Sequence, residues 1–245
     1  MSENQKKILL LFDFDNTISN ETSTYILRRE FLTPEEYEIN RELHETQTDW
    51  IGAGNDYLKL FKKHGVTLEK INKVLDTVTL TDGMDNLFNY VRKNKSKFDC
   101  ALLTSTFEYV INYLLKKFNI YDLFTEIYCV KSKIGKPEDD QVIYISERKK
   151  HDCNTCQPIG CKNFDYKEFC GSHDMNAYYK TVFICDGKND FCLAKNLKKN
   201  DAIFARKDHD LETKILILDE NRKQISGDLI IWTTGNDIVD YLKKQ

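Results

Sequence analysis

The sequence predicts an α/β protein with a doubly wound, mostly parallel sheet and a helical cap inserted after the first strand. Four short apolar runs, each followed by a polar turn and a helical pattern, lie at residues 8–12, 100–103, 181–185 and 228–232. Continuous apolar runs are typical of strands buried on both faces of a parallel sheet. Any single run could instead be a buried helix segment, but the same polar turn and helical pattern follow all four runs, which favours strands. Such sheets bind ligands beyond the carboxyl ends of their strands.

The segment after the first strand has a helical pattern. Thr33, Pro34 and Glu36 combine an N-cap residue, a proline at the first helical position and a glutamate at the third, which is a capping box. Helical spacing of apolar side chains then continues to residue 75, so three or four helices are expected. We therefore predict a cap over residues 21–79 and a core made of residues 1–20 and 80–245.

The remaining elements are an irregular insertion and a closing helix. Residues 131–176 hold four of the eight cysteines, and we expect a hairpin within them at about 141–150. Residues 235–242 predict an amphipathic helix at the end of the core.

Composition narrows the function classes. The chain has 36 Lys+Arg and 39 Asp+Glu, and this balance argues against a nucleic-acid partner bound through a dominant basic surface. No apolar stretch approaches the roughly 20 residues needed to span a bilayer, and the N-terminus does not resemble a secretory signal. We expect a cytoplasmic protein with no membrane contact and no evident protein partner. Its eight cysteines are then reduced thiols or metal ligands.

The loop after the first strand carries two carboxylates, Asp13 and Asp15, which can converge on one site. Two like charges buried together need a cation to offset them, and Mg²⁺ suits carboxylate oxygens. The first carboxylate can attack phosphorus to form an aspartyl-phosphate, and the second can protonate the leaving oxygen and then activate water. A solvated turn that simply ends a strand is the alternative explanation.

A second acidic loop strengthens the catalytic interpretation. Asp186 and Asp190 follow another apolar strand in a tight turn, so the two loops together can supply the oxygen ligands of Mg²⁺. Thr104, at the end of a third strand, adds a hydroxyl donor for a phosphoryl oxygen. A lysine is also needed to balance charge that develops in the transition state.

These motifs resemble those of the haloacid-dehalogenase-like phosphatase superfamily. Within it, the chain looks like the phosphoethanolamine/phosphocholine and pyridoxal-phosphate phosphatase family, because of the motifs at residues 151–162, 186–192 and 231–238. The resemblance covers roughly residues 8–242 and implies a Rossmann-like core. It implies a Mg²⁺-dependent phosphomonoesterase that acts on a small phosphorylated metabolite.

The resemblance also assigns roles to residues. Asp13 is the implied nucleophile and Asp15 the implied acid/base. Mg²⁺ is expected on Asp13, the backbone carbonyl of Asp15 and Asp186, while Asp190 orients or joins the metal shell. The phosphate is expected to bind Thr104 and a lysine.

Two substrate-binding positions depart from the family pattern. Members that bind cationic head groups carry aspartates near the ends of the first two motifs, where this chain has Thr24 and Ser105. Replacing a carboxylate by a hydroxyl leaves an ordinary hydrogen bond in place of a charge-assisted one. Glu21 and Glu108, each one helical turn away, could substitute in part. We therefore expect weak activity on phosphocholine and phosphoethanolamine.

Two lysines compete for the phosphate-binding role. Lys162 matches the family motif and lies one predicted helix before the strand that ends at Asp186. Lys136 lies in a Gly-Lys-Pro sequence that resembles the lysine motif of other branches of the superfamily. We favour Lys162; Lys136 is otherwise a turn residue.

A cysteine-rich motif suggests a second metal. His151, Cys153, Cys156 and Cys161 could hold a structural Zn²⁺, with Cys170 or His173 as substitutes for the histidine. Reduced thiols packed as small hydrophobic side chains are the alternative. His209 has no partner constellation in the sequence and is expected either at the surface or with its hydrogen bonds satisfied locally.

Other functions share parts of this pattern. A dehalogenase would need neither Asp15 nor the metal loop. A phosphotransferase would share every motif, and a catalytically inactive scaffold would be expected to have lost Asp13, Asp15 or Asp186, which are all present.

Overall fold

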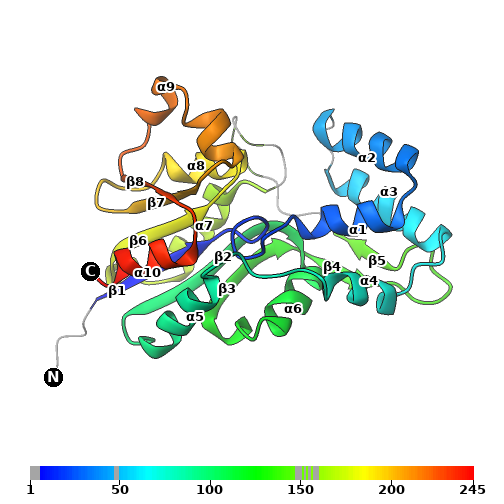
Figure 1. Ribbon diagram of the computed structural model, residues 1–245, viewed down its shortest axis with the longest axis horizontal. Coiled ribbons are helices and arrows are strands. Elements are labelled where there is room, and N and C mark those ends of the chain that lie inside the picture. The colour runs from blue at the N-terminus through cyan, green and yellow to red at the C-terminus, as the bar shows by residue number, and fades with distance from the viewer. Residues whose placement is uncertain (1–5, 47–49, 147–150, 152, 154–155, 157–159) are drawn as a thin grey trace.

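The computed structural model describes residues 6–46, 50–146, 151, 153, 156 and 160–245 (Figure 1). No helix among these residues is both long and apolar enough to cross a membrane. The strands are β1 Lys7–Phe12, β2 Phe98–Phe107, β3 Phe124–Val130, β4 Ser132–Ile134, β5 Ile143–Ile145, β6 Tyr178–Cys185, β7 Ala202–Arg206 and β8 Asp228–Trp232. The helices are α1 Ser23–Phe31, α2 Pro34–Thr46, α3 Trp50–Lys63, α4 Leu68–Leu75, α5 Met84–Lys93, α6 Glu108–Lys117, α7 Lys162–Ser172, α8 Phe191–Ala194, α9 Asp219–Arg222 and α10 Gly235–Leu242.

The six-stranded sheet has the order β3-β2-β1-β6-β7-β8, and all its neighbouring strands are parallel. The four predicted strands are confirmed as β1, β2, β6 and β8. Strands β3 and β7 were not predicted from the sequence. β3 lies at an edge of the sheet and mixes apolar with polar side chains, while β7 is a short strand with two alanines.

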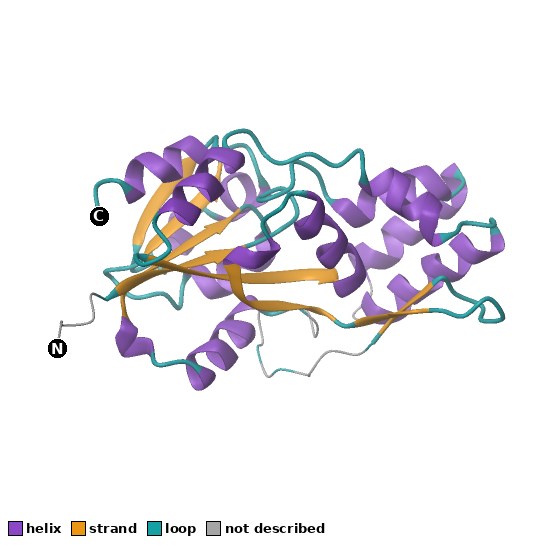
Figure 2. Ribbon diagram, turned by 90° about the horizontal axis from the view of Figure 1, so that it is seen from below, coloured by secondary structure: helices purple, strands orange, loops and turns teal. Residues whose placement is uncertain are grey.

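Helices cover both faces of the sheet, which confirms the doubly wound α/β fold (Figure 2). Alternate residues of β1 point to opposite faces, so Leu10 packs in one apolar cluster and Leu9 in the other. The cluster around Leu10 includes side chains of α5, α6 and α10. The cluster around Leu9 includes side chains of α7 and α8. Because both faces are covered, the central strands consist almost entirely of apolar residues.

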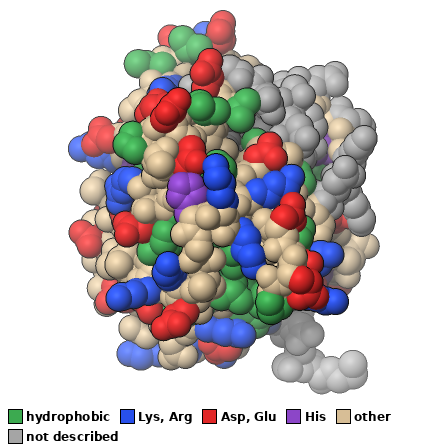
Figure 3. All heavy atoms as spheres, turned by 90° about the vertical axis from the view of Figure 1, so that its right-hand side faces the viewer, with side chains coloured by type: hydrophobic (Ala, Val, Ile, Leu, Met, Phe, Trp, Pro, Cys, Tyr) green, Lys and Arg blue, Asp and Glu red, His purple; other side chains and the backbone are tan. Residues whose placement is uncertain are grey.

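Five helices, α1 to α5, lie between β1 and β2 in the chain, and the first four correspond to the predicted cap. The predicted capping box is present: the backbone N–H of Thr33 donates to Glu36 Oε2 at 3.0 Å, and that of Glu36 donates to Thr33 Oγ1 at 3.2 Å. Figure 2 shows the cap helices grouped at the end of the molecule away from the two termini. Acidic and basic side chains are interspersed over this end (Figure 3).

The hairpin differs from its predicted position. It pairs β4 with β5 and turns at about residues 135–142, earlier than the expected 141–150, because Gly135 and Pro137 supply the turn. The Asn55 side chain of α3 bonds the backbone of Ile145 through both its amide nitrogen and its amide oxygen, at 3.0 Å each. The first part of the predicted core insertion thus packs against the cap helices, an association that a purely local pattern does not reveal.

The strand order places a switch point between β1 and β6. From β1 the chain continues outward through β2 and β3 on one side, and from β6 through β7 and β8 on the other. The crevice beyond the carboxyl ends of two such strands is where open α/β sheets bind ligands. Asp13 directly follows β1 and Asp186 directly follows β6.

Candidate active site

The two acidic loops meet at this switch point. Asp13 is held at the end of β1 because its backbone N–H donates to the carbonyl of Ile184 in β6 at 3.0 Å. Carboxylate oxygens of Asp13, Asp186 and Asp190 lie within 4.8 Å of one another, and all three residues are buried. The structure therefore brings together the two carboxyl-bearing segments that the sequence analysis combined.

Lys162 is the cation at the centre of this cluster. It is the first residue of α7, is 1% exposed, and places Nζ 2.7 Å from Asp13 Oδ1. The same Nζ also pairs with Asp190 Oδ1. Burial alone would lower the pKa of Lys162, but the attraction of Asp13 and Asp190 outweighs it and raises that pKa. Lys136, in contrast, is exposed in the turn between β4 and β5.

Asp190 organises the second loop. Its Oδ2 accepts hydrogen bonds from the backbone N–H of Gly187 at 2.7 Å and of Asp186 at 3.2 Å, while its Oδ1 pairs with Lys162. Both carboxylate oxygens are thus engaged by donors of this chain. Thr17, from the first motif, donates to Asp186 Oδ1 at 3.4 Å and links the two loops.

His209 also contacts this cluster, a partner that the sequence analysis did not identify. Its Nδ1 lies 3.5 Å from Asp186 Oδ2, and the residue lines the cavity described below. The contact was not predictable from the local pattern, because His209 follows β7, a strand that was not predicted from the sequence.

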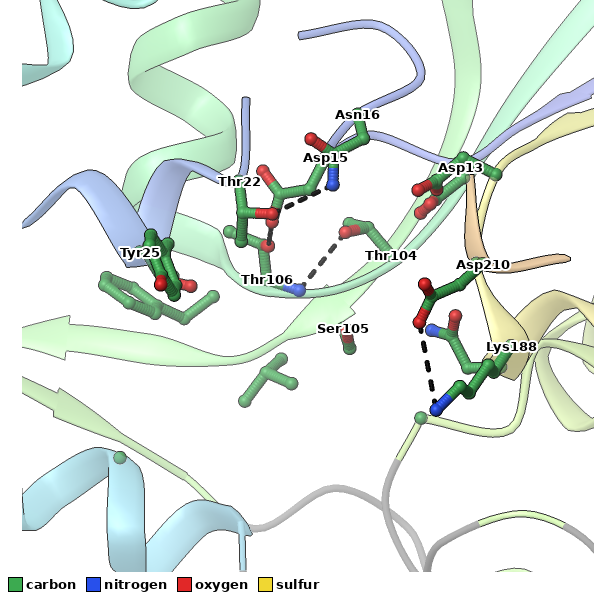
Figure 4. A pocket seen from close by; sticks show the side chains of 18 of the residues that line it. Asp13, Asp15, Asn16, Thr22, Tyr25, Thr104, Ser105, Thr106, Lys188 and Asp210 are labelled. Carbon is green, nitrogen blue, oxygen red and sulfur yellow. Dashed lines mark hydrogen bonds and ion pairs between the residues drawn. The ribbon is translucent and has the colours of Figure 1, made fainter. Parts of the chain in front are cut away.

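Asp15 is held apart from the other carboxylates by hydroxyl groups (Figure 4). Its Oδ1 accepts hydrogen bonds from Ser23 Oγ at 2.7 Å and from the Ser23 backbone N–H at 2.9 Å, and its Oδ2 accepts one from Thr106 Oγ1 at 2.6 Å. Sequence reasoning missed both partners. Thr104 Oγ1 accepts a hydrogen bond from the backbone N–H of Thr106 at 3.1 Å. The end of β2 therefore presents Thr104 beside the residue that orients Asp15.

The charge balance fits a bound divalent cation. The pKa of Asp13 is raised to about 8, mainly by burial; the positive charge of Lys162 opposes this rise and the negative charge of Asp186 contributes to it. Burial likewise raises the pKa of Asp190 to about 6. Three buried carboxylates facing the single charge of Lys162 leave an excess of negative charge, and a hard cation with carboxylate ligands would offset it.

A cavity of about 930 Å³ opens beside these groups, between the ends of the strands and the cap helices. Thr24 and Ser105, the two predicted substrate-binding residues, both line it. The suggested substitutes do not: Glu108 pairs with Lys131 at 2.8 Å, and Glu21 is exposed outside this lining.

The cap contributes aromatic and basic side chains to the cavity. Tyr25, Arg28 and Tyr57 line it, and the guanidinium of Arg28 lies 5.6 Å from the centre of the Tyr25 ring and 5.7 Å from that of Tyr57. Arg28 is 9% exposed and also donates to Asn40 Oδ1 at 3.0 Å. The sequence analysis named neither Tyr25 nor Arg28 as a candidate binding residue.

The cysteine-rich motif is assembled differently from the prediction. Cys153, Cys156 and Cys161 gather with Cys192, whereas His151 is not part of the set. His151 Nδ1 instead accepts a hydrogen bond from the backbone N–H of Cys153 at 3.2 Å, as its close spacing in sequence permits. Cys170 and His173 also lie outside the cluster.

The fold, with acidic loops after β1 and β6, defines a phosphatase of the haloacid-dehalogenase-like class. A family model described as "Putative Phosphatase" matches residues 8–245, and the chain belongs to that family. It is 29% identical to "Pyridoxal phosphate phosphatase PHOSPHO2" from Bos taurus, over 97% of this chain and 98% of the relative. It is 24% identical to "Phosphoethanolamine/phosphocholine phosphatase" from Gallus gallus, over 99% of this chain and 90% of the relative.

Solved structures confirm the fold. A substrate-bound phosphoserine phosphatase matches with a TM-score of 0.59 and 16% identity, over 97% of this chain and 99% of the other. Cytosolic 5'-nucleotidase IIIB bound to cytidine matches with a TM-score of 0.55 and 12% identity, over 97% and 85% of the two chains. The chain is thus a phosphatase whose relatives act on small phosphorylated metabolites.

Proposed function

We propose that the chain is a Mg²⁺-dependent phosphomonoesterase that works through an aspartyl-phosphate on Asp13. The observation that carries this proposal is the meeting of Asp13, Asp186 and Lys162 at the switch point of the sheet, beside a large cavity. One site then contains a nucleophile, an excess of negative charge that suits a metal ion, and a cation that can bind phosphate.

The residues divide the chemistry between two steps. In the first, an oxygen of Asp13 attacks phosphorus, the bond from phosphorus to the alcohol oxygen breaks, and Asp15 gives that oxygen its proton. In the second, Asp15 takes a proton from water, whose oxygen attacks the same phosphorus and releases inorganic phosphate and the Asp13 carboxylate. Ser23 and Thr106 hold Asp15 in place for both proton transfers.

The remaining groups bind the phosphoryl group and the metal. Lys162 and Thr104 would hold phosphoryl oxygens, because one supplies a buried positive charge and the other a hydroxyl at the end of β2. Asp13, the backbone carbonyl of Asp15 and Asp186 would hold Mg²⁺, which when bound neutralises charge on the phosphoryl oxygens. Asp190 acts as a positioning residue, since its two oxygens already bind Lys162 and the loop backbone.

Phosphate release from p-nitrophenyl phosphate tests this function. We expect hydrolysis with Mg²⁺ and its loss when a chelator removes the ion, with recovery when Mg²⁺ is restored. Asp13→Asn is the control for contaminating phosphatases, because it removes the nucleophile and keeps the size of the side chain. Equal hydrolysis by this variant and the parent protein would exclude Asp13 as the nucleophile.

We further propose that the substrate carries a planar, uncharged or anionic leaving group, as pyridoxal phosphate does. The positive charge of Arg28 lies within 5.7 Å of the centres of two tyrosine rings that also line the cavity. The rings suit a flat leaving group, and the charge of Arg28 suits an acidic group and disfavours a cationic head group. Thr24 and Ser105 add hydroxyls and no negative charge that could pair with an amine. The relative named as a pyridoxal phosphate phosphatase supports the same substrate class.

Specificity constants for pyridoxal phosphate, phosphocholine and phosphoethanolamine test this substrate class. We expect the highest kcat/KM for pyridoxal phosphate. Phosphocholine turnover at an equal kcat/KM would refute the proposed role of Arg28, while the Mg²⁺-dependent chemistry would stand.

A further inference from the structure

Four cysteines from three separate segments gather beside the phosphatase site, and we call them the thiol cluster: Cys153, Cys156, Cys161 and Cys192. Cys153 and Cys156 form a Cys-x-x-Cys pair, Cys161 is the N-cap of α7, and Cys192 lies in α8. Cys161 and Cys192 are 2% and 5% exposed, and the other two are partly buried.

The sulfur positions match a tetrahedral metal site. The Sγ atoms all lie within 4.8 Å of one another, with Cys153 and Cys192 at 3.4 Å and Cys161 and Cys192 at 3.9 Å. A Zn–S distance of about 2.3 Å in a regular tetrahedron gives sulfur separations of roughly 3.8 Å. A disulfide requires about 2.05 Å. All eight cysteines are among the described residues and none forms a disulfide.

The donor set favours one kind of ion. Four sulfurs with no carboxylate among them suit a soft or borderline metal, and the Cys-x-x-Cys spacing is typical of zinc sites. Mg²⁺ prefers oxygen ligands, so the neighbouring carboxylates and the thiol cluster select different metals. Packing alone explains thiols such as Cys100, which is buried in a strand among apolar side chains, but does not require four sulfurs to converge.

We propose that the thiol cluster binds one structural Zn²⁺ ion, separate from the magnesium site. Bound zinc would join the segment before α7 to α8. These two attachment points flank the phosphatase site, because Cys161 directly precedes Lys162 and Cys192 lies two residues after Asp190. The ion would hold in register the two elements whose side chains form the Lys162–Asp190 pair. This inference does not depend on the proposed catalytic function.

Metal analysis of the intact protein, purified under reducing conditions without chelator, is the first test. We expect about one equivalent of zinc per chain. After removal of the metal, Co²⁺ should produce the thiolate-to-cobalt charge-transfer and visible bands of tetrahedral sulfur coordination. A protein that binds neither ion, that holds iron instead, or whose cluster thiols are found as disulfides would overturn the proposal.

Variants locate the ion within the molecule. Cys192→Ser should lose most of the zinc and the cobalt bands, whereas Cys170→Ser, the matched control in α7, should keep both. Asp186→Asn should also keep the zinc, because it alters only the carboxylate site. Zinc lost from Asp186→Asn, or retained in full by Cys192→Ser, would place the ion elsewhere. Circular dichroism checks that each variant is folded, and the cobalt spectrum of the unaltered protein tests the site independently of them.

Discussion

Replacing Lys162 by methionine removes the positive charge from the carboxylate cluster while it keeps a side chain of similar length. Lys162 Nζ lies 2.7 Å from Asp13 Oδ1, also contacts Asp190 Oδ1, and is 1% exposed. Removing one partner of a buried ion pair costs about 3–5 kcal/mol of unfolding free energy, because the remaining charges lose their compensation. We expect that destabilisation in metal-free protein at neutral pH, measured by denaturant titration.

The same variant should also lose activity. A preorganised group that stabilises developing charge is worth about 2.7–4 kcal/mol, which corresponds to a decrease of roughly 100- to 1,000-fold in kcat/KM. Steady-state phosphate release with saturating Mg²⁺ measures this decrease, and circular dichroism verifies that the variant is folded.

Lys136→Met is the matched control. Lys136 is exposed, and the interaction of its backbone N–H with Asp139 Oδ2 at 2.8 Å does not involve the side chain. Stability should therefore change by no more than about 0.5 kcal/mol, and activity should stay near that of the parent protein. A folded Lys162→Met variant with full activity, or a Lys136→Met variant with the greater loss, would refute the assignment of the phosphate lysine.

Three further outcomes are expected. Asp13→Asn should lower turnover by at least about 1,000-fold, measured as Mg²⁺-dependent phosphate release, with the thermal unfolding transition still cooperative. Thr106→Val removes a 2.6 Å hydrogen bond to Asp15 and should lower kcat by roughly 10- to 150-fold, and an unchanged kcat would contradict its positioning role. Arg28→Met should lower the ratio of kcat/KM for pyridoxal phosphate to kcat/KM for phosphocholine by about tenfold. An unchanged ratio would show that the charge of Arg28 does not set the proposed specificity.

The central strands and the acidic loops were predictable because their signals are local. A continuous apolar run that ends at Asp13 predicts a buried strand followed by a polar loop, and the run before Asp186 predicts the same. β3 gave a weaker signal, because an edge strand buries fewer of its side chains and alternates with polar residues. Without β3 and β7, the number and order of the strands could not be predicted, although the meeting of the two acidic loops could.

The supporting contacts were missed because they join distant parts of the chain. Ser23 comes from the first cap helix, so its approach to Asp15 depends on how that helix packs against the sheet, whereas Thr106 reaches Asp15 because β2 pairs with β1. Periodicity describes the face of one element and contains no information about which two elements meet. His209 illustrates the same limit, since only the fold brings it to Asp186.

Cys192 differs from these cases, since its position follows from the contact between Lys162 and Asp190. If Lys162 must reach the loop that ends at Asp190, then the residues beside each of them come close as well, and both Cys161 and Cys192 are such neighbours. The local motif suggested His151 as the fourth ligand. The fourth sulfur is instead that of Cys192, which is brought close by the pairing of Lys162 with Asp190. The contact between Lys162 and Asp190 therefore also brings Cys161 close to Cys192, so the carboxylate cluster and the thiol cluster are linked by the adjacency of their residues along the chain.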